Sequence, residues 1–412
     1  MTERAGTFVF ALAGKADADN IIPVIWETSK DGQACDVIIT DRAVHAAQHD
    51  AWWVRERPSV RVIANFAIDG APTMRERIRR IRWNRAVVRR YLRDRDARLV
   101  AVQWREGVAH DSAILVRRVI RWWSTDYFVQ LQLAARDLGI PTVALPHGHS
   151  TKTTVIRSRH VREMSAAHGD KLPFADRDSF AAYVFCSDYH RDAIVEGSTM
   201  EGHNVRVWGS PRFNDVWVPR LYAESPKAKL PEPLAGAKRR VLFFVPKWQN
   251  LVDRAATMQL IAALGADDRV QLVVRGHLRA EAAALAPEER AVLERGNVVL
   301  ITDDVSSASL IKACDVVVDV DSSIAFDAVL LGKPYVRPRY LQDASVKTIW
   351  DELGGAHQTS SLADTVALLS SDALEPAERH HTFDDVVFGG DGVVVLARYR
   401  DGLRSLAAQS LV

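Results

Sequence analysis

Histidine, lysine and hydroxyl side chains follow an apolar run in the stretch VALPHGHSTKTT, residues 143–154. Pro146 has no N–H to donate to a neighbouring strand, and Gly148 allows backbone conformations that other residues avoid. A strand that ends here therefore leaves His147 directly beyond its carboxyl end. An imidazole in that place can take a proton from a hydroxyl near neutral pH. A turn in which His147 only caps backbone groups is the alternative. We predict that His147 is catalytic and that an acceptor is bound by the residues after it, namely His149, Ser150, Thr151 and Lys152.

A second cluster is VVRGH, residues 273–277, in which Arg275 and His277 flank a glycine at the expected end of a strand. Glycine lets a ligand approach the backbone closely, and a cation beside an imidazole suits a phosphate group. We predict that Arg275 binds the donor of a transfer reaction and that His277 is catalytic. A solvated loop histidine is the alternative interpretation.

The most specific pattern is DVVVDVDSSIAFDAVLLGKP, residues 315–334. A buried strand is expected to end at Asp321, and Ser322 and Ser323 then open a helix whose free N–H groups suit an anion such as a diphosphate. Gly332 is expected to end this helix, because glycine is the usual residue at a helix C-terminus.

The same stretch contains a D-x-D pattern, Asp319-Val-Asp321, which in another class of sugar-nucleotide transferases holds a divalent metal. Residues i and i+2 of a strand share a face, so both carboxylates could meet one ion. Such metal motifs belong to a single-domain architecture, however, whereas this one lies in a second α/β half. We therefore expect no metal in the site.

The elements that position these residues are apolar runs rich in Val, Ile and Phe, separated by helical patterns. This alternation is typical of parallel strands covered by helices on both faces. The alternation begins again after residue 235, and a stretch with four prolines, 218–238, suits a linker between the two halves of the chain. We predict an N-terminal acceptor-binding domain over residues 1–222, a linker over 223–238, a nucleotide-donor-binding domain over 239–385 and a C-terminal helix over 386–412 that could pack back on the first domain.

Both domains are expected to be doubly wound and Rossmann-like. In open parallel sheets ligands bind beyond the carboxyl ends of the strands, so residues directly after each apolar run are site candidates. That rule selects His147, Lys247, His277, Asp303 and Ser322.

Composition excludes several classes of protein. The formal net charge is only +2 over 412 residues, which argues against nucleic-acid binding through charge. The three cysteines lie far apart without a C-x-x-C spacing, so neither a zinc site nor a disulfide framework is expected and a reducing cytoplasm fits best. No apolar stretch reaches 18 residues, so no membrane span is expected.

Two arginine-rich stretches, 74–98 and 115–128, combine basic residues with tryptophan and tyrosine. Basic faces beside aromatic rings are typical of peripheral contact with an anionic membrane, here the inner face of the cell membrane. A solvated helix face with aromatic core anchors is the alternative.

In the order of its motifs the chain resembles the CDP-glycerol glycerophosphotransferase family, whose enzymes prime or polymerise teichoic acids and related capsule polymers in a GT-B fold. The resemblance covers about residues 140–400. It rests on PHG (146–148), YVFCSDYHRD (183–192), VRVWGSPRFND (205–215), VLFFVPKWQ (241–249), VVRGH (273–277) and ACDVVVDVDSSIAFDAVLLGKP (313–334).

This resemblance implies an α/β, GT-B-like fold in which two doubly wound Rossmann-like domains face each other across a cleft. The donor would be held by its diphosphate in the second domain, and transfer to the acceptor would take place in the cleft without a metal or other cofactor. His147 would be the base and His277 would contact the donor phosphate. The resemblance also implies that Ser322 and Ser323 bind the donor phosphate. Asp327 would orient that turn of the helix, and Asp321 would reach the sugar or the base of the donor. Lys247 is expected to bind the donor as well.

Some positions depart from the family. Leu278 follows His277 where the family commonly shows proline, and Pro246-Lys247-Trp248-Gln249 stands where a P-T-W-R segment is expected. These changes leave the phosphate-binding pattern in place and leave the donor unspecified.

We therefore expect a transferase that moves a glycosyl or polyol-phosphate group from a CDP-, UDP- or CMP-linked donor to a cell-surface polysaccharide or lipid-linked acceptor. A non-hydrolysing nucleotide-sugar 2-epimerase is one alternative, because it shares the fold and the donor site. A catalytically silent scaffold in polysaccharide assembly is the other.

Overall fold

The computed structural model describes residues 6–40, 54, 57–64, 85–105, 107, 127–154, 158–233, 237–275, 287–294, 297–301 and 305–409. The chain forms two compact units. Unit 1 comprises residues 1–149, 171–214 and 386–412, and unit 2 comprises residues 150–170 and 215–385. No helix in the described ranges is both long enough and apolar enough to span a membrane.

Unit 1 contains a seven-stranded parallel sheet with the order β3-β2-β1-β4-β5-β6-β7. Every residue of β1 is buried, as expected for a central strand covered on both faces. Because strands are added in opposite directions from β1 and from β4, the topological switch point lies between these two strands. The strands are β1 (Thr7–Leu12), β2 (Cys35–Ile39), β3 (Val60–Ala64), β4 (Ala97–Gln103), β5 (Thr142–Leu145), β6 (Ala182–Phe185) and β7 (Val205–Val207).

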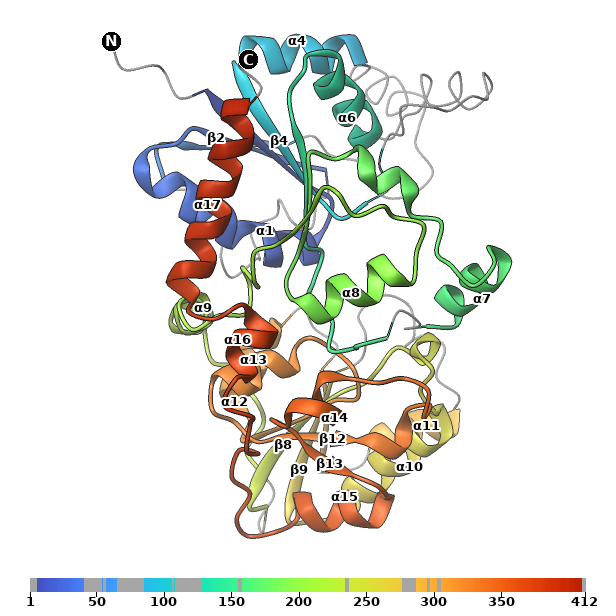
Figure 1. Cartoon of the computed structure of the whole chain (residues 1–412). Coiled ribbons are helices and arrows are strands. Elements are labelled where there is room, and N and C mark those ends of the chain that lie inside the picture. The colour runs from blue at the N-terminus through green and yellow to red at the C-terminus, as the bar shows by residue number, and fades with distance from the viewer. Residues whose placement is uncertain are drawn as a thin grey trace. The chain divides into compact units, whose positions relative to one another are not determined.

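Helices cover this sheet in two groups. The C-terminal helix α17 runs alongside α1 and contacts β4, whereas α4 and α6 pack against each other and against β4 (Figure 1). The helices are α1 (Lys15–Thr28), α4 (Arg85–Asp94), α6 (Tyr127–Asp137), α8 (Asp188–Glu196) and α17 (Gly392–Gln409).

Unit 2 contains a six-stranded parallel sheet with the order β10-β9-β8-β11-β12-β13. Here the switch point lies between β8 and β11, so the loops after these strands meet at one place on the carboxyl edge. The strands are β8 (Arg239–Phe244), β9 (Val270–Arg275), β10 (Val298–Ile301), β11 (Val316–Val318), β12 (Tyr335–Pro338) and β13 (His357–Thr359).

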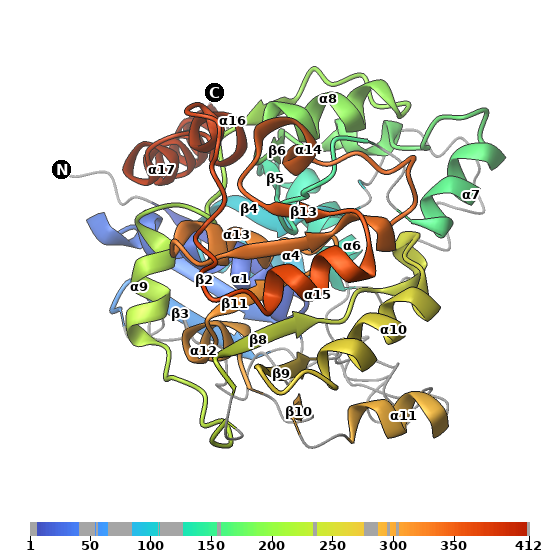
Figure 2. The same cartoon turned by 90° about the horizontal axis from the view of Figure 1, so that it is seen from below.

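One face of this sheet is covered by α10 and α15, which lie side by side in Figure 2. Leu260 and Ile261 of α10 and Leu369 of α15 join Phe243 and Val274 of the strands in one buried cluster. The helices and short 3₁₀ turns of the unit include α7 (Arg159–Ala167), α9 (Trp217–Glu224), η4 (Trp248–Asn250), α10 (Arg254–Leu264), α11 (Pro287–Leu293), α12 (Ser307–Ala313), α13 (Ala325–Leu330), η6 (Arg339–Leu341), α14 (Ile349–Leu353) and α15 (Leu362–Leu369).

The division into units differs from the expected domain boundaries in two places. Residues 150–170 and helix α9 are grouped with unit 2, although the first segment and most of α9 lie within the expected N-terminal domain, residues 1–222. Within α16 (Phe383–Phe388) the chain passes back into unit 1, and α17 packs there against α1. An ion pair at 3.4 Å between Arg400 and the buried carboxylate of Glu27 accompanies this packing.

Candidate functional site

His147 lies directly beyond the carboxyl end of β5 in unit 1, two residues after Leu145. Its Nδ1 is 3.2 Å from Oδ1 of Asp17, on the first turn of α1. The two side chains differ in exposure, because that of His147 is 55% exposed and that of Asp17 only 2%. In the residues that the structure describes, Nε2 of His147 has no hydrogen-bond partner, so a buried carboxylate lies behind an imidazole that is open on its other side.

Helix α1 begins at the carboxyl end of β1, and this start holds Asp17 in place. Its Oδ2 accepts the backbone N–H groups of Ala13 at 2.5 Å and Gly14 at 3.2 Å, which a helix N-terminus would otherwise leave unpaired. Asn20, one turn later, donates from Nδ2 to the carbonyl oxygen of His147 at 3.2 Å. Neither residue was predicted from the sequence, although an acidic residue three positions after a glycine at a strand end is a recognisable helix-start signal.

His149 does not lie where it was expected to contact the acceptor. It is buried, its Nε2 lies 2.6 Å from the carbonyl oxygen of Val387, and its ring packs between Phe213 and Phe388. This position favours a role in holding the C-terminal segment of unit 1, because a buried ring between two aromatic side chains has no surface left for an acceptor.

Ser150, Thr151 and Lys152 belong to unit 2 and not to the expected acceptor-binding domain. Lys152 forms an antiparallel bridge with Thr348, flanked by backbone hydrogen bonds from Thr153 to Lys347 and from Ile349 to Thr151. The hydroxyl of Ser150 accepts the backbone N–H of Lys152 at 3.1 Å. The segment after His149 is therefore a structural part of unit 2.

Lys152 and Asp321 form a buried ion pair in unit 2. Nζ lies 2.7 Å from Oδ2, and the two side chains are only 6% and 3% exposed. Thr151, fully buried, donates from Oγ1 to the carbonyl oxygen of Asp321 at 3.4 Å. The expected acceptor residues thus contact a residue predicted for the donor.

The loop after β11, residues 319–323, is held from several sides. The Asp319 carboxylate accepts the backbone N–H groups of the next three residues, Val320, Asp321 and Ser322, at 2.6, 3.3 and 2.8 Å. The carbonyl oxygen of Asp319 accepts from the Tyr335 hydroxyl at 3.3 Å, and that of Val320 accepts from Nε of the fully buried Arg337 at 3.2 Å. A loop bonded in this way is held in one conformation by groups of the protein itself.

Because of these bonds, the backbone at Ser322 and Ser323 differs from the anion site that the sequence predicted. The N–H of Ser322 is taken by Asp319, and the Ser322 hydroxyl accepts the N–H of Ile324 at 3.3 Å. The α-helix begins at Ala325, later than expected, because tight turns occupy residues 322–324. Of the two serines, only Ser323 has a backbone N–H without a partner among the described residues.

The D-x-D carboxylates do not form the expected pair on one face of a strand. Strand β11 ends at Val318, so both residues lie in the loop, where Asp319 faces the backbone and Asp321 faces Lys152. Burial raises the pKa of the Asp319 carboxyl to about 7 and the charge of Asp321 adds to this effect, whereas the three backbone N–H groups oppose it. Among the described residues no cluster of His, Cys, Asp and Glu could hold a metal ion.

The remaining donor candidates follow neighbouring strands of unit 2. Lys247 comes after β8 and immediately precedes η4, and Arg275 is the last residue of β9 and is buried. Since β8 lies between β9 and β11, both residues share the carboxyl edge of the sheet with the 319–323 loop. Asp327 is fully buried on α13, inside the unit. His277 and Asp303 lie outside the described residues, so their expected roles stay predictions.

The arginine-rich stretches are described only in part, since residues 65–84 and 108–126 lie outside the described ranges. In α4, Val88 and Leu92 are buried. Arg85 pairs with Asp137, and Arg95 donates two hydrogen bonds to the buried Asp36. This part of the stretch is used for packing within unit 1, which favours the solvated-helix interpretation there.

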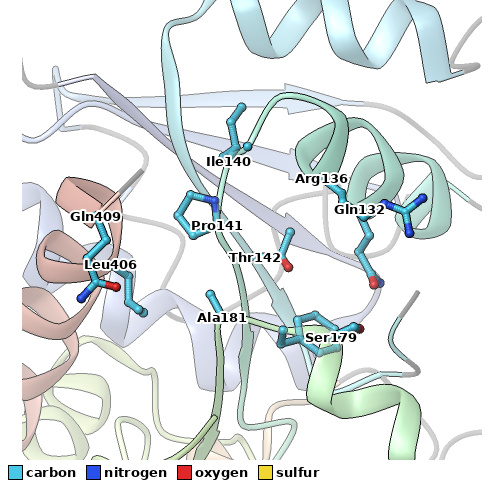
Figure 3. Close-up of a pocket in the computed structure, with 11 residues that line it drawn as sticks. Gln132, Arg136, Ile140, Pro141, Thr142, Ser179, Ala181, Leu406 and Gln409 are labelled. Atoms are coloured by element: carbon cyan, nitrogen blue, oxygen red, sulfur yellow. The ribbon is translucent and has the colours of Figure 1, made fainter. Parts of the chain in front are cut away.

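A cavity of about 380 Å³ opens in unit 1 at the amino ends of β5 and β6 (Figure 3). Thr142 lines it from the start of β5, Ser179 from the turn before β6, Gln132 and Arg136 from α6, and Leu406 and Gln409 from α17. Because His147 follows the opposite, carboxyl end of β5, this cavity is separate from the candidate site.

No family model and no curated protein matches the chain. Solved structures do match it over nearly its whole length. UDP-GlcNAc 2-epimerase from Neisseria meningitidis, bound to UDP-GlcNAc, is 12% identical with a TM-score of 0.54, and the match covers 98% of this chain and 100% of that one. The wall teichoic acid polymerase TagF is 13% identical with a TM-score of 0.54, covering 99% and 91%. HepE from Anabaena, in complex with UDP-glucose, is 12% identical with a TM-score of 0.54, covering 97% and 100%.

At such low identity these similarities concern the fold. They confirm the predicted fold class, because two parallel-sheet, Rossmann-like domains of seven and six strands match proteins of the GT-B fold.

Proposed function

We propose that the chain is a GT-B transferase that moves a glycosyl or polyol-phosphate group from a nucleotide-activated donor to a hydroxyl of a polysaccharide or lipid-linked acceptor. The observation that carries this proposal is the open imidazole of His147 with the buried carboxylate of Asp17 at its Nδ1, 3.2 Å away. A histidine oriented in this way is suited to take a proton through Nε2.

In the proposed reaction an acceptor hydroxyl gives its proton to Nε2 of His147 as its oxygen attacks the electrophilic carbon or phosphorus of the donor. The bond between that atom and the departing phosphate oxygen breaks, and the nucleotide leaves with the additional negative charge. Lys247, Arg275 and the backbone N–H of Ser323 would stabilise this charge from the carboxyl edge of unit 2. Lys247 forms no ion pair with any described residue, so its ammonium group is available for an anion.

Unit 2 supports the donor side of the proposal through the loop 319–323. Its carbonyl oxygens and its N–H groups other than that of Ser323 are bonded to the protein, which suits a loop that presents fixed groups to a ligand. Lys152, which pairs with Asp321 in this unit, is five residues after His147 in the chain.

The names of the similar structures support a nucleotide-linked substrate, since two of them contain UDP-GlcNAc and UDP-glucose and another is a teichoic acid polymerase. We extend this to the present chain as a proposal. The CDP-glycerol donor, the capsule-type acceptor and peripheral membrane contact on the cytoplasmic face rest on the sequence resemblance and composition alone. No metal is included in the proposed mechanism, because both D-x-D carboxylates have partners in the protein.

The test is the variant His147→Ala, assayed for release of nucleotide from UDP-GlcNAc, UDP-glucose and CDP-glycerol with an extract of cell-surface polymer as acceptor. We expect loss of transfer by at least about 100-fold, the lower end of what general-base catalysis contributes, with unchanged nucleotide binding by calorimetry. His203→Ala is the matched control, because that histidine is exposed in unit 1 and precedes the amino end of β7, whereas His147 follows the carboxyl end of β5. Turnover within a few-fold of the wild type would refute the role of His147.

An epimerase remains the second candidate because an epimerase shares the fold over 98% of this chain. Incubation with UDP-GlcNAc in the absence of any acceptor separates the two functions. Conversion of the sugar to its 2-epimer, followed by NMR, would favour the epimerase, whereas a transferase leaves the sugar configuration unchanged.

A further inference from the structure

We infer that Asp17 is the residue that positions His147 and sets which of its nitrogens carries the proton, an inference that rests on the proposed function. Asp17 lies 130 positions away in the sequence, and its Oδ1 is 3.2 Å from Nδ1 of His147. Its side chain is almost completely buried, so the carboxylate is held by the protein and not by water.

The carboxylate is fixed before any substrate binds. Its second oxygen accepts the N–H groups of Ala13 and Gly14, which close the start of α1. A carboxylate in the first turn of a helix is also stabilised by the positive end of the helix dipole. Asp17 therefore has little freedom to turn away from His147.

Asn20 fixes the backbone of the same histidine. It lies three residues after Asp17, and residues at this spacing share one face of a helix. Its Nδ2 donates to the carbonyl oxygen of His147 at 3.2 Å. One face of α1 thus holds both the ring and the main chain of His147.

This geometry selects one tautomer. With the proton on Nδ1, the ring donates a hydrogen bond to Asp17 and leaves the lone pair of Nε2 on the open side. With the proton on Nε2, the lone pair of Nδ1 would face a carboxylate, which is repulsive. When Nε2 takes the acceptor proton, the imidazolium that forms lies beside the Asp17 charge, and Asp17 itself gains no proton. A base of this kind is suited to a neutral hydroxyl acceptor.

The tautomer can be measured directly by two-dimensional NMR of protein labelled with ¹⁵N in histidine, without any substrate. The signals of His147 are assigned by their absence in His147→Gln. We expect the Nδ1–H form in the wild type and a shift toward the Nε2–H form, which free imidazoles prefer, in Asp17→Asn. Asp36→Asn is the matched control, because it removes another fully buried carboxylate of unit 1 that contacts Arg95 and Tyr91 but not His147.

An Nε2–H signal for His147 in the wild type would overturn the inference, and so would an unchanged tautomer in Asp17→Asn. The wild-type spectrum requires no variant, so the test holds even if Asp17→Asn fails to fold.

A double-mutant cycle separates positioning from a merely structural role. With UDP-GlcNAc or CDP-glycerol as donor, whichever is turned over, we expect Asp17→Asn to lower kcat at least about tenfold with little change in the donor KM, and to have no further effect when His147 is already alanine. Independent, additive losses would overturn the inference. Turnover retained by His147→Ala would refute the proposed base, whereas an inactive His147→Ala together with a fully active Asp17→Asn would overturn only the role of Asp17.

Discussion

The buried ammonium group of Lys152 is paired with the buried carboxylate of Asp321. Removing two charged groups from water is costly, and the cost is offset only when the pair stays together with good geometry. Nζ of Lys152 and Oδ2 of Asp321 meet at 2.7 Å with both side chains almost completely buried. The pair therefore fixes where the segment after His147 attaches to unit 2, and it also neutralises a carboxylate beside the proposed phosphate site.

We expect Lys152→Met to lower the free energy of unfolding by about 3 to 5 kcal/mol, because it leaves Asp321 buried without its counter-charge. The double variant Lys152→Met with Asp321→Asn should recover much of this loss, measured by urea denaturation. Lys238→Met is the control, since that lysine pairs with Asp372 at the exposed surface, where an ion pair contributes at most about 1 kcal/mol. Losses that simply add in the double variant would show that the two residues are not coupled.

The loop 319–323 is an element whose conformation is set by buried side chains. Asp319 binds the N–H groups that follow it, while Tyr335 and Arg337 of β12 bind the carbonyl oxygens of Asp319 and Val320. Arg337 is held in turn by Asp351, Gln342 and Gln358. A loop bonded on all sides needs no rearrangement to receive a ligand, which is favourable for binding.

Asp319 should make the stability of unit 2 depend on pH. Its pKa is raised by burial to about 7 in the folded protein, above the value of about 4 for an unfolded chain. The folded state therefore binds more protons than the unfolded state between these values, and stability is lost as the pH rises through this window. Relative to Asp319→Asn, the free energy of unfolding of the wild type should fall by about 1.4 kcal/mol per pH unit from about pH 4 to 7 and then level off.

Urea titrations of both proteins at several pH values measure this difference. Parallel curves for the wild type and Asp319→Asn would contradict it, and would mean that the three backbone N–H groups cancel the effect of burial on the pKa of Asp319.

The whole chain is organised as two units, each of which is built from segments that are not contiguous in the sequence. The backbone passes from one unit to the other at four places, after residues 149, 170, 214 and 385. The segment 150–170 thereby adds Lys152 to unit 2, and the segment 386–412 adds α17 to unit 1. Each unit therefore contains residues that are distant in the sequence. Because residues 150–170 belong to unit 2, a ligand that binds unit 2 should also stabilise the segment that follows His147 in the chain.

Binding of the donor nucleotide should be visible as thermal stabilisation. At 100 times the Kd a ligand of the folded state contributes about 2.7 kcal/mol, which for a unit of this size raises the Tm by about 5 to 10 °C. A screen of UDP, CDP and CMP should give this shift for one base, and Lys247→Met should reduce the shift without changing the Tm of the free protein. Lys229→Met, an exposed lysine of the same unit, is the control. No shift with any nucleotide at millimolar concentration would favour the scaffold alternative.

The strands were predictable because buried parallel strands require continuous apolar runs, which are local in the sequence. Strands of the structure lie in such apolar runs, including Thr7–Leu12, Arg239–Phe244 and Val270–Arg275. Gly332 has a φ of +64° just after α13, a conformation that glycine adopts without strain, so the end of this helix was predictable as well. The rule that ligands bind beyond strand ends also located His147, Lys247 and Ser322 at carboxyl edges.

The partners of these residues were not predictable in the same way. His147 meets Asp17 across 130 positions, and Lys152 meets Asp321 across 169. Such contacts depend on the order of strands in a sheet and on the path that each loop takes, and no periodicity or spacing within one segment carries that information. Local composition therefore determined the strands, the helix ends and the edge at which chemistry takes place, while the packing of distant segments decided that Lys152 belongs with Asp321 and that a buried carboxylate lies behind His147.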